Sequence, residues 1–182
     1  MKPCSSKWLG LNCSCYYRED TYSCNVVSIN LNQVGLSGYF PANFASFQHL
    51  HSLDIGNNFI YGSVPHELNF MKSMVVLDIS NNYISGTIPN FEGATNIKSL
   101  YLLDNFLQGN LPSYSNLPKL RYLNVSLNYI VGSIPAFNNL NFLTKFDCGY
   151  NNLSGIIPSF ESNNNLQIRA LHYNQLSGSI LL

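Results

Sequence analysis

A short motif returns along this chain every 23 or 24 residues, and this regular spacing constrains the fold more than any other feature. Each copy has alternating apolar residues followed by a glycine, and most copies also carry an asparagine and a proline. The copies begin at Val26, Leu50, Met74, Ile97, Leu120, Leu143 and Leu166, and the asparagines are Asn58, Asn82, Asn105, Asn128, Asn151 and Asn174. A fixed period of this size predicts a solenoid, in which each unit buries its apolar face by stacking on its neighbours. The functional feature to expect is therefore a long regular surface rather than a catalytic pocket.

The unit at residues 74–89 shows the pattern most clearly. Leu77 and Ile79 are two residues apart, which predicts a strand with both side chains inward and the alternate residues, including Ser80, outward. Asn82 follows where the chain must turn, and its amide can bond the backbone of its own and the neighbouring coils. Strands stacked about 4.8 Å apart would form a parallel sheet on one face of the solenoid.

This unit fits L-x-x-L-x-L-x-x-N-x-L-x-G-x-I-P, and it resembles the plant-type subclass of leucine-rich repeats. That subclass occurs in receptor-kinase and receptor-like ectodomains and in polygalacturonase-inhibiting proteins. The resemblance covers residues 26–182 and implies an α/β repeat fold, a right-handed superhelix or horseshoe with a concave parallel β-sheet. It also implies short helical or 3₁₀ segments on the convex side, for example at residues 65–72.

The chain departs from the pattern near both ends. Val34 replaces the asparagine of the first unit, and Arg169 takes an inward strand position in the last, so we expect that coil to be irregular or open to solvent. Leu181 replaces the last proline, and no capping sequence follows it. We therefore expect a Cys-rich cap at residues 1–25 and about seven repeats at residues 26–182, the last of them incomplete.

Charge is scarce in this chain. Only 10% of its residues are charged, against about 25% in typical proteins, and the formal net charge is zero. Neither nucleic acid nor an anionic membrane surface is attracted to such a chain, and no apolar run is long enough to span a membrane. Few charges combined with many Asn and Tyr residues indicate a hydrogen-bonding surface that is prone to association.

Four of the five cysteines precede the first repeat. A zinc site is one interpretation, although the spacing contains no CxxC pair. The stretch from Cys4 to Cys13 brackets a Trp-x-Gly motif and resembles the N-terminal cap of plant-type leucine-rich-repeat ectodomains. That resemblance implies the disulfides Cys4–Cys13 and Cys15–Cys24, and hence an oxidising compartment. Cys148 instead takes the strand position of Ile79 in the pattern, so we expect a buried free thiol.

Secretion is the localisation that these features favour. The first residues carry no apolar signal segment, so we expect that a leader has been removed or lies outside this sequence. Three N-glycosylation sequons agree with an extracellular or cell-surface protein, at Asn12, Asn124 and Asn152. Asn124 should project from the concave sheet, where a glycan would obstruct a ligand.

We find no catalytic constellation, no metal motif and no cofactor motif in the sequence. Asp54, Asp78 and Asp147 take the same outward strand position in different units. The adjacent pair Asp54 and Asp78 could act as an acid/base pair or bind a cation. The favoured interpretation is a solvated row of small polar residues.

Two surface rows are candidates for binding. The first lies on the concave face, where tyrosine rings can pack while their hydroxyls bond a ligand. We expect its ligand-binding residues to be Tyr101, Asp104, Tyr122, Leu127, Asp147, Tyr150 and Tyr173. The second row follows the asparagines in four successive units and should form a ladder of rings about 4.8 Å apart. We expect this ladder, a possible self-association surface, to comprise Phe59, Tyr83, Phe106 and Tyr129.

The leading hypothesis is a non-catalytic extracellular recognition module that binds a protein, peptide or glycan through its concave face. The alternative is a structural subunit of a glycosylated matrix, coat or fibril, which self-assembles through the aromatic ladder and its open end into homo-oligomers or filaments. Ice binding would need a flat row of Thr or Asn, and the residues before the Ile-Pro pairs are too irregular for it. Enzyme activity, nucleic-acid binding and direct membrane insertion are not expected.

Overall fold

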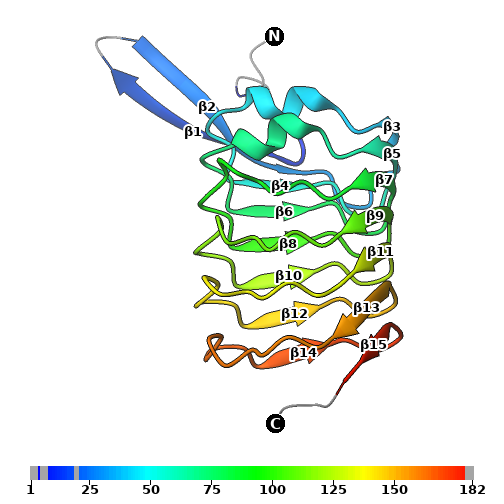
Figure 1. Ribbon diagram of the computed structural model, residues 1–182. Helices are drawn as coiled ribbons and strands as arrows, with labels where there is room; N and C mark the ends of the chain where they lie inside the picture. The colour runs from blue at the N-terminus through cyan, green and yellow to red at the C-terminus, as the bar shows by residue number, and fades with distance from the viewer. Residues whose placement is uncertain (1–3, 5–7, 19–20, 179–182) are drawn as a thin grey trace.

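The computed structural model describes residue 4, residues 8–18 and residues 21–178. Two sheets extend along a stack of coils (Figure 1). The eight-stranded sheet consists, in spatial order, of β1 (Leu11–Arg18), β2 (Thr21–Asn30), β4 (Ser52–Asp54), β6 (Val76–Asp78), β8 (Ser99–Tyr101), β10 (Tyr122–Asn124), β12 (Lys145–Asp147) and β14 (Ile168–Ala170). The seven-stranded sheet consists of β15 (Gln175–Ser177), β13 (Asn152–Ile156), β11 (Tyr129–Gly132), β9 (Phe106–Asn110), β7 (Tyr83–Thr87), β5 (Phe59–Ser63) and β3 (Ser37–Tyr39).

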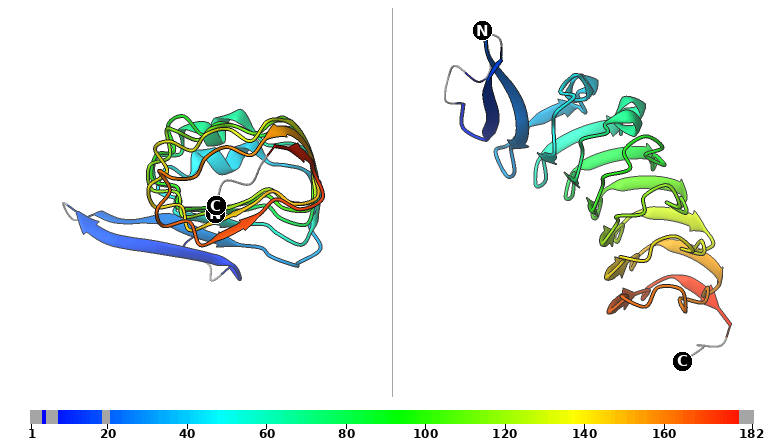
Figure 2. Two further views of the ribbon diagram at one scale, coloured as in Figure 1. Left: turned by 60° about the horizontal axis from the view of Figure 1, so that its bottom comes forward. Right: turned by 90° about the vertical axis from the view of Figure 1, so that its left-hand side faces the viewer.

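Each coil contributes one strand to each sheet, and neighbouring coils pair in parallel. The stack curves, and its two short 3₁₀ helices, η1 (Ala42–Ser46) and η2 (His66–Phe70), lie on the outer side of the curve (Figure 2). The predicted solenoid with a parallel sheet and short 3₁₀ segments is confirmed, because η2 falls within residues 65–72. Within the described part of the chain, no helix has the length and apolarity needed to cross a membrane.

The core is a column of apolar side chains that repeats with the coils. Leu77 and Ile79 are at most 1% exposed, as the alternation predicts, and their equivalents in the other central coils are buried in the same way. Ser80 is buried as well, although the alternation places it on the outward side together with Asp78. Its hydroxyl donates a hydrogen bond to Asp78 Oδ1, which holds the side chain against the sheet.

Cys148 takes the strand position of Ile79 in its own coil. Its side chain is completely buried and forms no disulfide, as predicted. Burial, and secondarily the neighbouring Asp147 carboxylate, raises the pKa of the thiol to about 12. A thiol that stays protonated and inaccessible packs as a small apolar residue and does not act as a nucleophile.

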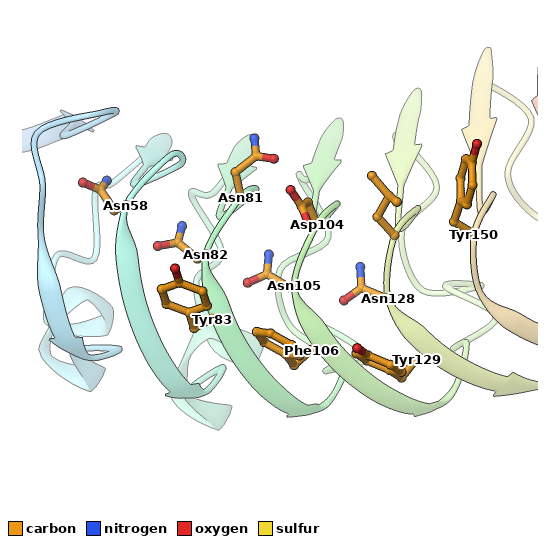
Figure 3. Close-up of a pocket in the computed structure, with 11 residues that line it drawn as sticks. Asn58, Asn81, Asn82, Tyr83, Asp104, Asn105, Phe106, Asn128, Tyr129 and Tyr150 are labelled. Atoms are coloured by element: carbon orange, nitrogen blue, oxygen red, sulfur yellow. The ribbon is translucent and has the colours of Figure 1, made fainter.

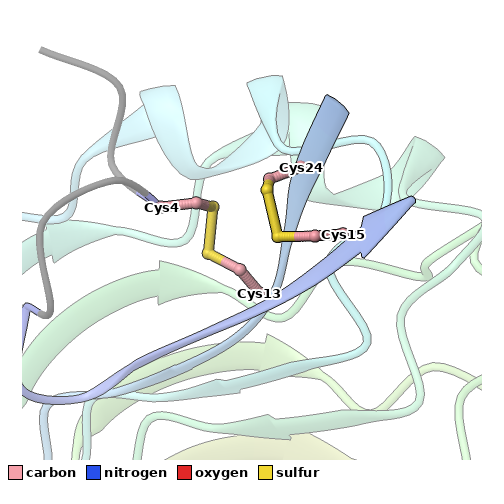
Figure 4. The surroundings of a disulfide bond; sticks show 4 residues. All are labelled: Cys4, Cys13, Cys15 and Cys24. Atoms are coloured by element: carbon pink, nitrogen blue, oxygen red, sulfur yellow. A yellow bond between two sulfur atoms is a disulfide. The ribbon is translucent and has the colours of Figure 1, made fainter. Parts of the chain in front are cut away.

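The cap is a hairpin that projects from the first coil (Figure 1). Its strands β1 and β2 pair antiparallel from Leu11 with Ile29 to Arg18 with Thr21. Disulfides join Cys4 to Cys13 and Cys15 to Cys24 (Figure 4), so these sulfurs are not zinc ligands. The second disulfide staples the two hairpin strands directly, because Cys15 and Cys24 are register partners.

The last coil stays regular even though it carries a charge in its inward position. β14 pairs with β12 in register, with Arg169 opposite Phe146. Arg169 is exposed, and its guanidinium lies 5.5 Å from the centre of the Phe160 ring. The charge is thus accommodated in an exposed position over the face of an aromatic ring. Leu181 lies outside the described residues.

Candidate functional site

A row of asparagines lies between the two sheets and fixes the bend of each coil. Asn105 is typical: its amide nitrogen donates to the carbonyls of Ile79, Leu102 and Leu103, at 3.0, 3.4 and 3.1 Å. Its amide oxygen accepts a bond of 2.9 Å from the backbone N–H of Ile84 in the preceding coil. Each such amide therefore satisfies buried peptide groups of two coils, as the sequence predicts.

The predicted aromatic ladder forms one side of this row, where Figure 3 shows its members Tyr83, Phe106 and Tyr129. Adjacent rings of the four residues are nearly parallel, with centroids 6.2, 6.0 and 5.9 Å apart in chain order. The spacing exceeds the predicted 4.8 Å because the seven-stranded sheet is slipped by two residues. Tyr83, for example, pairs with Tyr61 rather than with its repeat equivalent Phe59. Equivalent rings are thus diagonal neighbours, so they overlap only partly and each remains about half exposed.

The residue before each ladder asparagine forms the other side. In five central and C-terminal coils this residue has a positive φ of 52–55°, at Asn81, Asp104, Leu127, Tyr150 and Tyr173. Leu and Tyr rarely adopt this left-handed conformation. Leu127 and Tyr150 nevertheless do so, and they remain 43% and 45% exposed. The bend imposed by the asparagine thus aims these side chains outward at a cost of about 1 kcal/mol each.

A groove of about 450 Å³ lies between these two sides and spans several coils (Figure 3). The asparagine row forms its floor, and its lining residues are Asn58, Asn81, Asn82, Tyr83, Asp104, Asn105, Phe106, Leu127, Asn128, Tyr129 and Tyr150. Three residues from each predicted row therefore form opposite walls of one groove, namely Asp104, Leu127 and Tyr150 on one side and Tyr83, Phe106 and Tyr129 on the other. Asp104 is the one charged residue among these lining residues.

Not every predicted site residue reaches the groove. Phe59 continues the ladder beyond its end, and Tyr173 stacks on Tyr150 with ring centres 4.3 Å apart. The remaining three lie on the strand face beside the groove: Tyr101, Tyr122 and Asp147. Asn81 and the floor asparagines are lining residues that the predicted binding set omits.

The C-terminal end of the groove is an aromatic cluster. His172 contacts both tyrosines edge-on, with centroids 5.1 Å from Tyr150 and 5.5 Å from Tyr173. Desolvation, followed by the adjacent Tyr173, raises the pKa of Tyr150 above the ordinary value of 10.0. The cluster therefore offers ring faces and uncharged hydroxyls, which suit hydrogen bonding as well as packing.

The strand face beside the groove is mostly engaged in its own contacts. The Lys145 ammonium lies 5.7 Å from the centre of the Tyr122 ring. Asp54 Oδ1 accepts bonds from Asn32 Nδ2 at 2.9 Å and from the Gly56 N–H at 3.1 Å. Among the residues that the structure describes, no three His, Cys, Asp or Glu side chains gather as metal ligands would. The carboxylates of Asp54 and Asp78 thus stabilise the turns that follow their own strands.

Asp78 provides a test of this interpretation. Burial is the largest influence on its carboxyl group and raises the pKa, although Ser80 donates two hydrogen bonds to it. Asn124 accepts the same two bonds from Ser126, so an asparagine fits this turn. We expect Asp78→Asn to raise the melting temperature slightly at pH 7, because it removes a desolvated charge and keeps the bonds.

The effect of Asp78→Asn on stability should depend on pH. The pKa of Asp78 in the folded state lies above the ordinary value of 3.8, so the wild type gains stability as the pH falls from the folded-state pKa to 3.8. The advantage of Asp78→Asn should therefore shrink on acidification and vanish below pH 3.8. Thermal unfolding of both proteins between pH 3 and 8 measures it, and a variant less stable at pH 7 would contradict the assignment.

The three sequons differ in accessibility. Asn12 in β1 and Asn152 in β13 are exposed, and Asn152 takes the next position in the row that contains the ladder. Asn124 is half-buried on the strand face, and its amide oxygen accepts bonds from the Ser126 N–H and hydroxyl. The structure thus favours Asn12 and Asn152 as acceptors over Asn124.

Several known proteins resemble this chain in sequence or in structure. The family model described as Leucine Rich Repeat matches residues 49–71 and 73–93. No curated protein sequence matches the chain. Among solved structures, PEPR1-AtPEP1 is 32% identical with a TM-score of 0.88, and the match covers 98% of this chain and 24% of that one. Pollen Receptor Kinase 3 is 29% identical with a TM-score of 0.81, covering 100% of this chain and 86% of that one.

A third similar structure is the Arabidopsis receptor kinase HAESA, in complex with the peptide hormone IDA and the co-receptor SERK1. It is 29% identical with a TM-score of 0.77, and the match covers 80% of this chain and 25% of that one. The chain thus spans about a quarter of the length of the first receptors that it resembles.

Proposed function

We propose that this chain, which is a leucine-rich-repeat protein with the Cys-rich cap of plant receptor ectodomains, is an extracellular, non-catalytic module that binds a protein or peptide. In this proposal residues 1–25 cap the solenoid and residues 26–182 present the binding surface. The ligand lies in the groove and on the adjoining concave strand face. The single observation that carries the proposal is the groove itself, whose two walls bring together three residues from each candidate row.

The chemistry of the groove favours an extended, largely apolar segment. The floor amides are occupied by the backbone, so they hold the shape but offer little to a ligand. Contact must come from the walls, where rings face the side chains of Leu127 and Tyr150. Asp104 adds one negative charge, which would pair with a single basic group of the ligand.

The comparisons support a peptide or protein ligand. The HAESA structure contains a peptide hormone and a co-receptor, and RGFR1, 30% identical with a TM-score of 0.68, is a plant peptide hormone receptor in complex with RGF2. The two disulfides support an extracellular location, where such bonds persist. Neither the contacts nor the comparisons support assembly into filaments, and we do not propose it.

Peptide selection on the intact chain tests the proposal. A random-peptide display library is panned on wild-type protein, and the affinities of selected peptides are measured for Tyr150→Ala and Tyr122→Ala. Tyrosines in a binding centre commonly contribute about 2 kcal/mol, so we expect affinity to fall about thirtyfold in Tyr150→Ala and less in Tyr122→Ala.

Tyr16→Ala is the matched control, because Tyr16 is 47% exposed, close to the value for Tyr150, but lies in the cap hairpin. The control should bind as tightly as the wild type. A selection that yields no peptide above background, or peptides that bind both variants with unchanged affinity, would contradict the proposal.

A further inference from the structure

The outer face of the seven-stranded sheet carries an aromatic surface that the proposed function does not use in full. It adds two exposed tyrosines, one in β3 and one in β5, to the ladder, and its members are Tyr39, Phe59, Tyr61, Tyr83, Phe106 and Tyr129. Tyr39 and Tyr61 touch edge-on with centroids 4.6 Å apart. The surface ends where Asn152 takes the next ring position. We refer to these six residues as the aromatic face.

This sheet is also free of charge. None of the residues in β3, β5, β7, β9, β11, β13 and β15 is acidic, basic or histidine. Exposed hydroxyls and amides lie on the same outer side of the strands as the rings, at Ser63, Ser85, Thr87, Gln108 and Asn110. The ladder rings are offset from one another by the slipped register, and each of them stays about half exposed.

We propose that the aromatic face binds a neutral, extended polysaccharide. A sugar ring has a flat C–H face, which packs on an aromatic ring, and hydroxyls at its edge, which bond amides and hydroxyls. The four ladder rings repeat at a nearly constant step of 5.9–6.2 Å, as the sugars of a linear polymer repeat at a constant step. Successive sugars can thus rest on successive coils.

The absence of charged residues from these strands indicates which class of polymer the aromatic face can bind. Nucleic acids and acidic polysaccharides also stack on rings or line up along grooves, but they need Lys or Arg nearby to offset their charge. A neutral polysaccharide needs none. A protein partner would bind an irregular patch with a charged or polar rim and an Arg or Trp anchor. The uniform, uncharged row fits a repeating neutral ligand better.

This inference goes beyond the proposed peptide site, although three rings serve both surfaces. Tyr39, Phe59 and Tyr61 do not line the groove, whereas Tyr150 lines the groove and lies off the aromatic face. Substitutions at these positions therefore separate the two activities.

Isothermal titration of the glycosylated chain with hexasaccharides tests the inference. The probes are cellohexaose and mannohexaose, with an oligogalacturonide hexamer as the acidic comparison. We expect the wild type to bind at least one neutral probe and not the acidic one. The double variant Phe59→Ala/Tyr61→Ala, which removes two rings, should bind about tenfold more weakly or worse.

The matched control is Phe70→Ala/Phe142→Ala, because these rings are 57% and 52% exposed but lie outside the seven-stranded sheet. It should bind the sugar as the wild type does, and so should Tyr150→Ala. Phe106→Leu, which keeps the apolar volume but removes a ring face, should also weaken binding and covers the case in which the double variant fails to fold.

Three results would overturn the inference. One is an absence of binding to both neutral probes, and another is equal sugar affinity in the wild type and Phe106→Leu. The third is dimerisation of the wild type that the ring substitutions abolish without any sugar binding, which would make this face a contact between copies of the chain. Loss of peptide binding in Tyr150→Ala would change neither the sugar binding nor the dimerisation on which these three results depend.

Discussion

Replacing Asn105 with leucine is expected to lower the free energy of unfolding by about 3–5 kcal/mol. The substitution leaves the Ile84 N–H without its acceptor, and it removes the donor from three carbonyls in the bend. Asn105 is only 5% exposed, so water cannot replace these bonds without opening the coil. Each unsatisfied buried group costs about 1–3 kcal/mol, part of which the larger apolar side chain offsets.

Urea unfolding followed by circular dichroism measures this loss. Asn110→Leu is the control, because Asn110 is exposed on the outer face of β9 and should change stability by less than about 0.5 kcal/mol. Equal midpoints for the two variants would mean that the asparagine row does not hold the coils together.

Substituting Gly10 by alanine is expected to destabilise the cap by about 3 kcal/mol or more. Gly10 has φ +85°, and a Cβ there would lie closer to the Asn30 carbonyl oxygen than any real contact allows. The obstacle is backbone, and it is fixed because the Asn30 N–H donates to the Gly10 carbonyl at 2.6 Å. This explains the glycine of the Trp-x-Gly motif: the residue that leads into β1 meets the end of β2 through a bare backbone contact.

Gly35→Ala isolates the conformational part of that cost. Gly35 also has a positive φ of +74°, but nothing lies within 4 Å of an added Cβ. We expect about 1 kcal/mol for this variant, the ordinary cost of alanine in a left-handed conformation. The melting temperatures of the two variants should differ clearly. Similar losses of stability for both would argue against the close backbone contact between Gly10 and Asn30.

Much of the architecture follows directly from the sequence. The period predicts the stack, and the alternation at Leu77 and Ile79 predicts which side chains form the core. The position of Cys148 in its repeat likewise predicts a buried free thiol, because a cysteine in a core position packs like its neighbours. These predictions hold because they depend on positions repeated in every coil, where one pattern is tested several times over.

The groove is what the sequence did not predict. Its walls meet only because the residue before each asparagine adopts a positive φ, and Leu127 and Tyr150 are residue types that normally avoid it. The slip of the seven-stranded sheet, seen in the pairing of Tyr61 with Tyr83, likewise depends on how coils stack. Such features arise from contacts between repeats, which the pattern within one repeat does not encode. The signal to search for is the residue directly before the repeated asparagine.

The claim that the groove is the binding site is tested most directly by backbone hydrogen exchange of the wild-type chain, with and without a selected peptide. We expect added protection at residues 81–83, 104–106, 127–129 and 150, where the walls and floor meet. Added protection confined to the cap hairpin or to the convex segments around η1 and η2, with these residues unchanged, would contradict it.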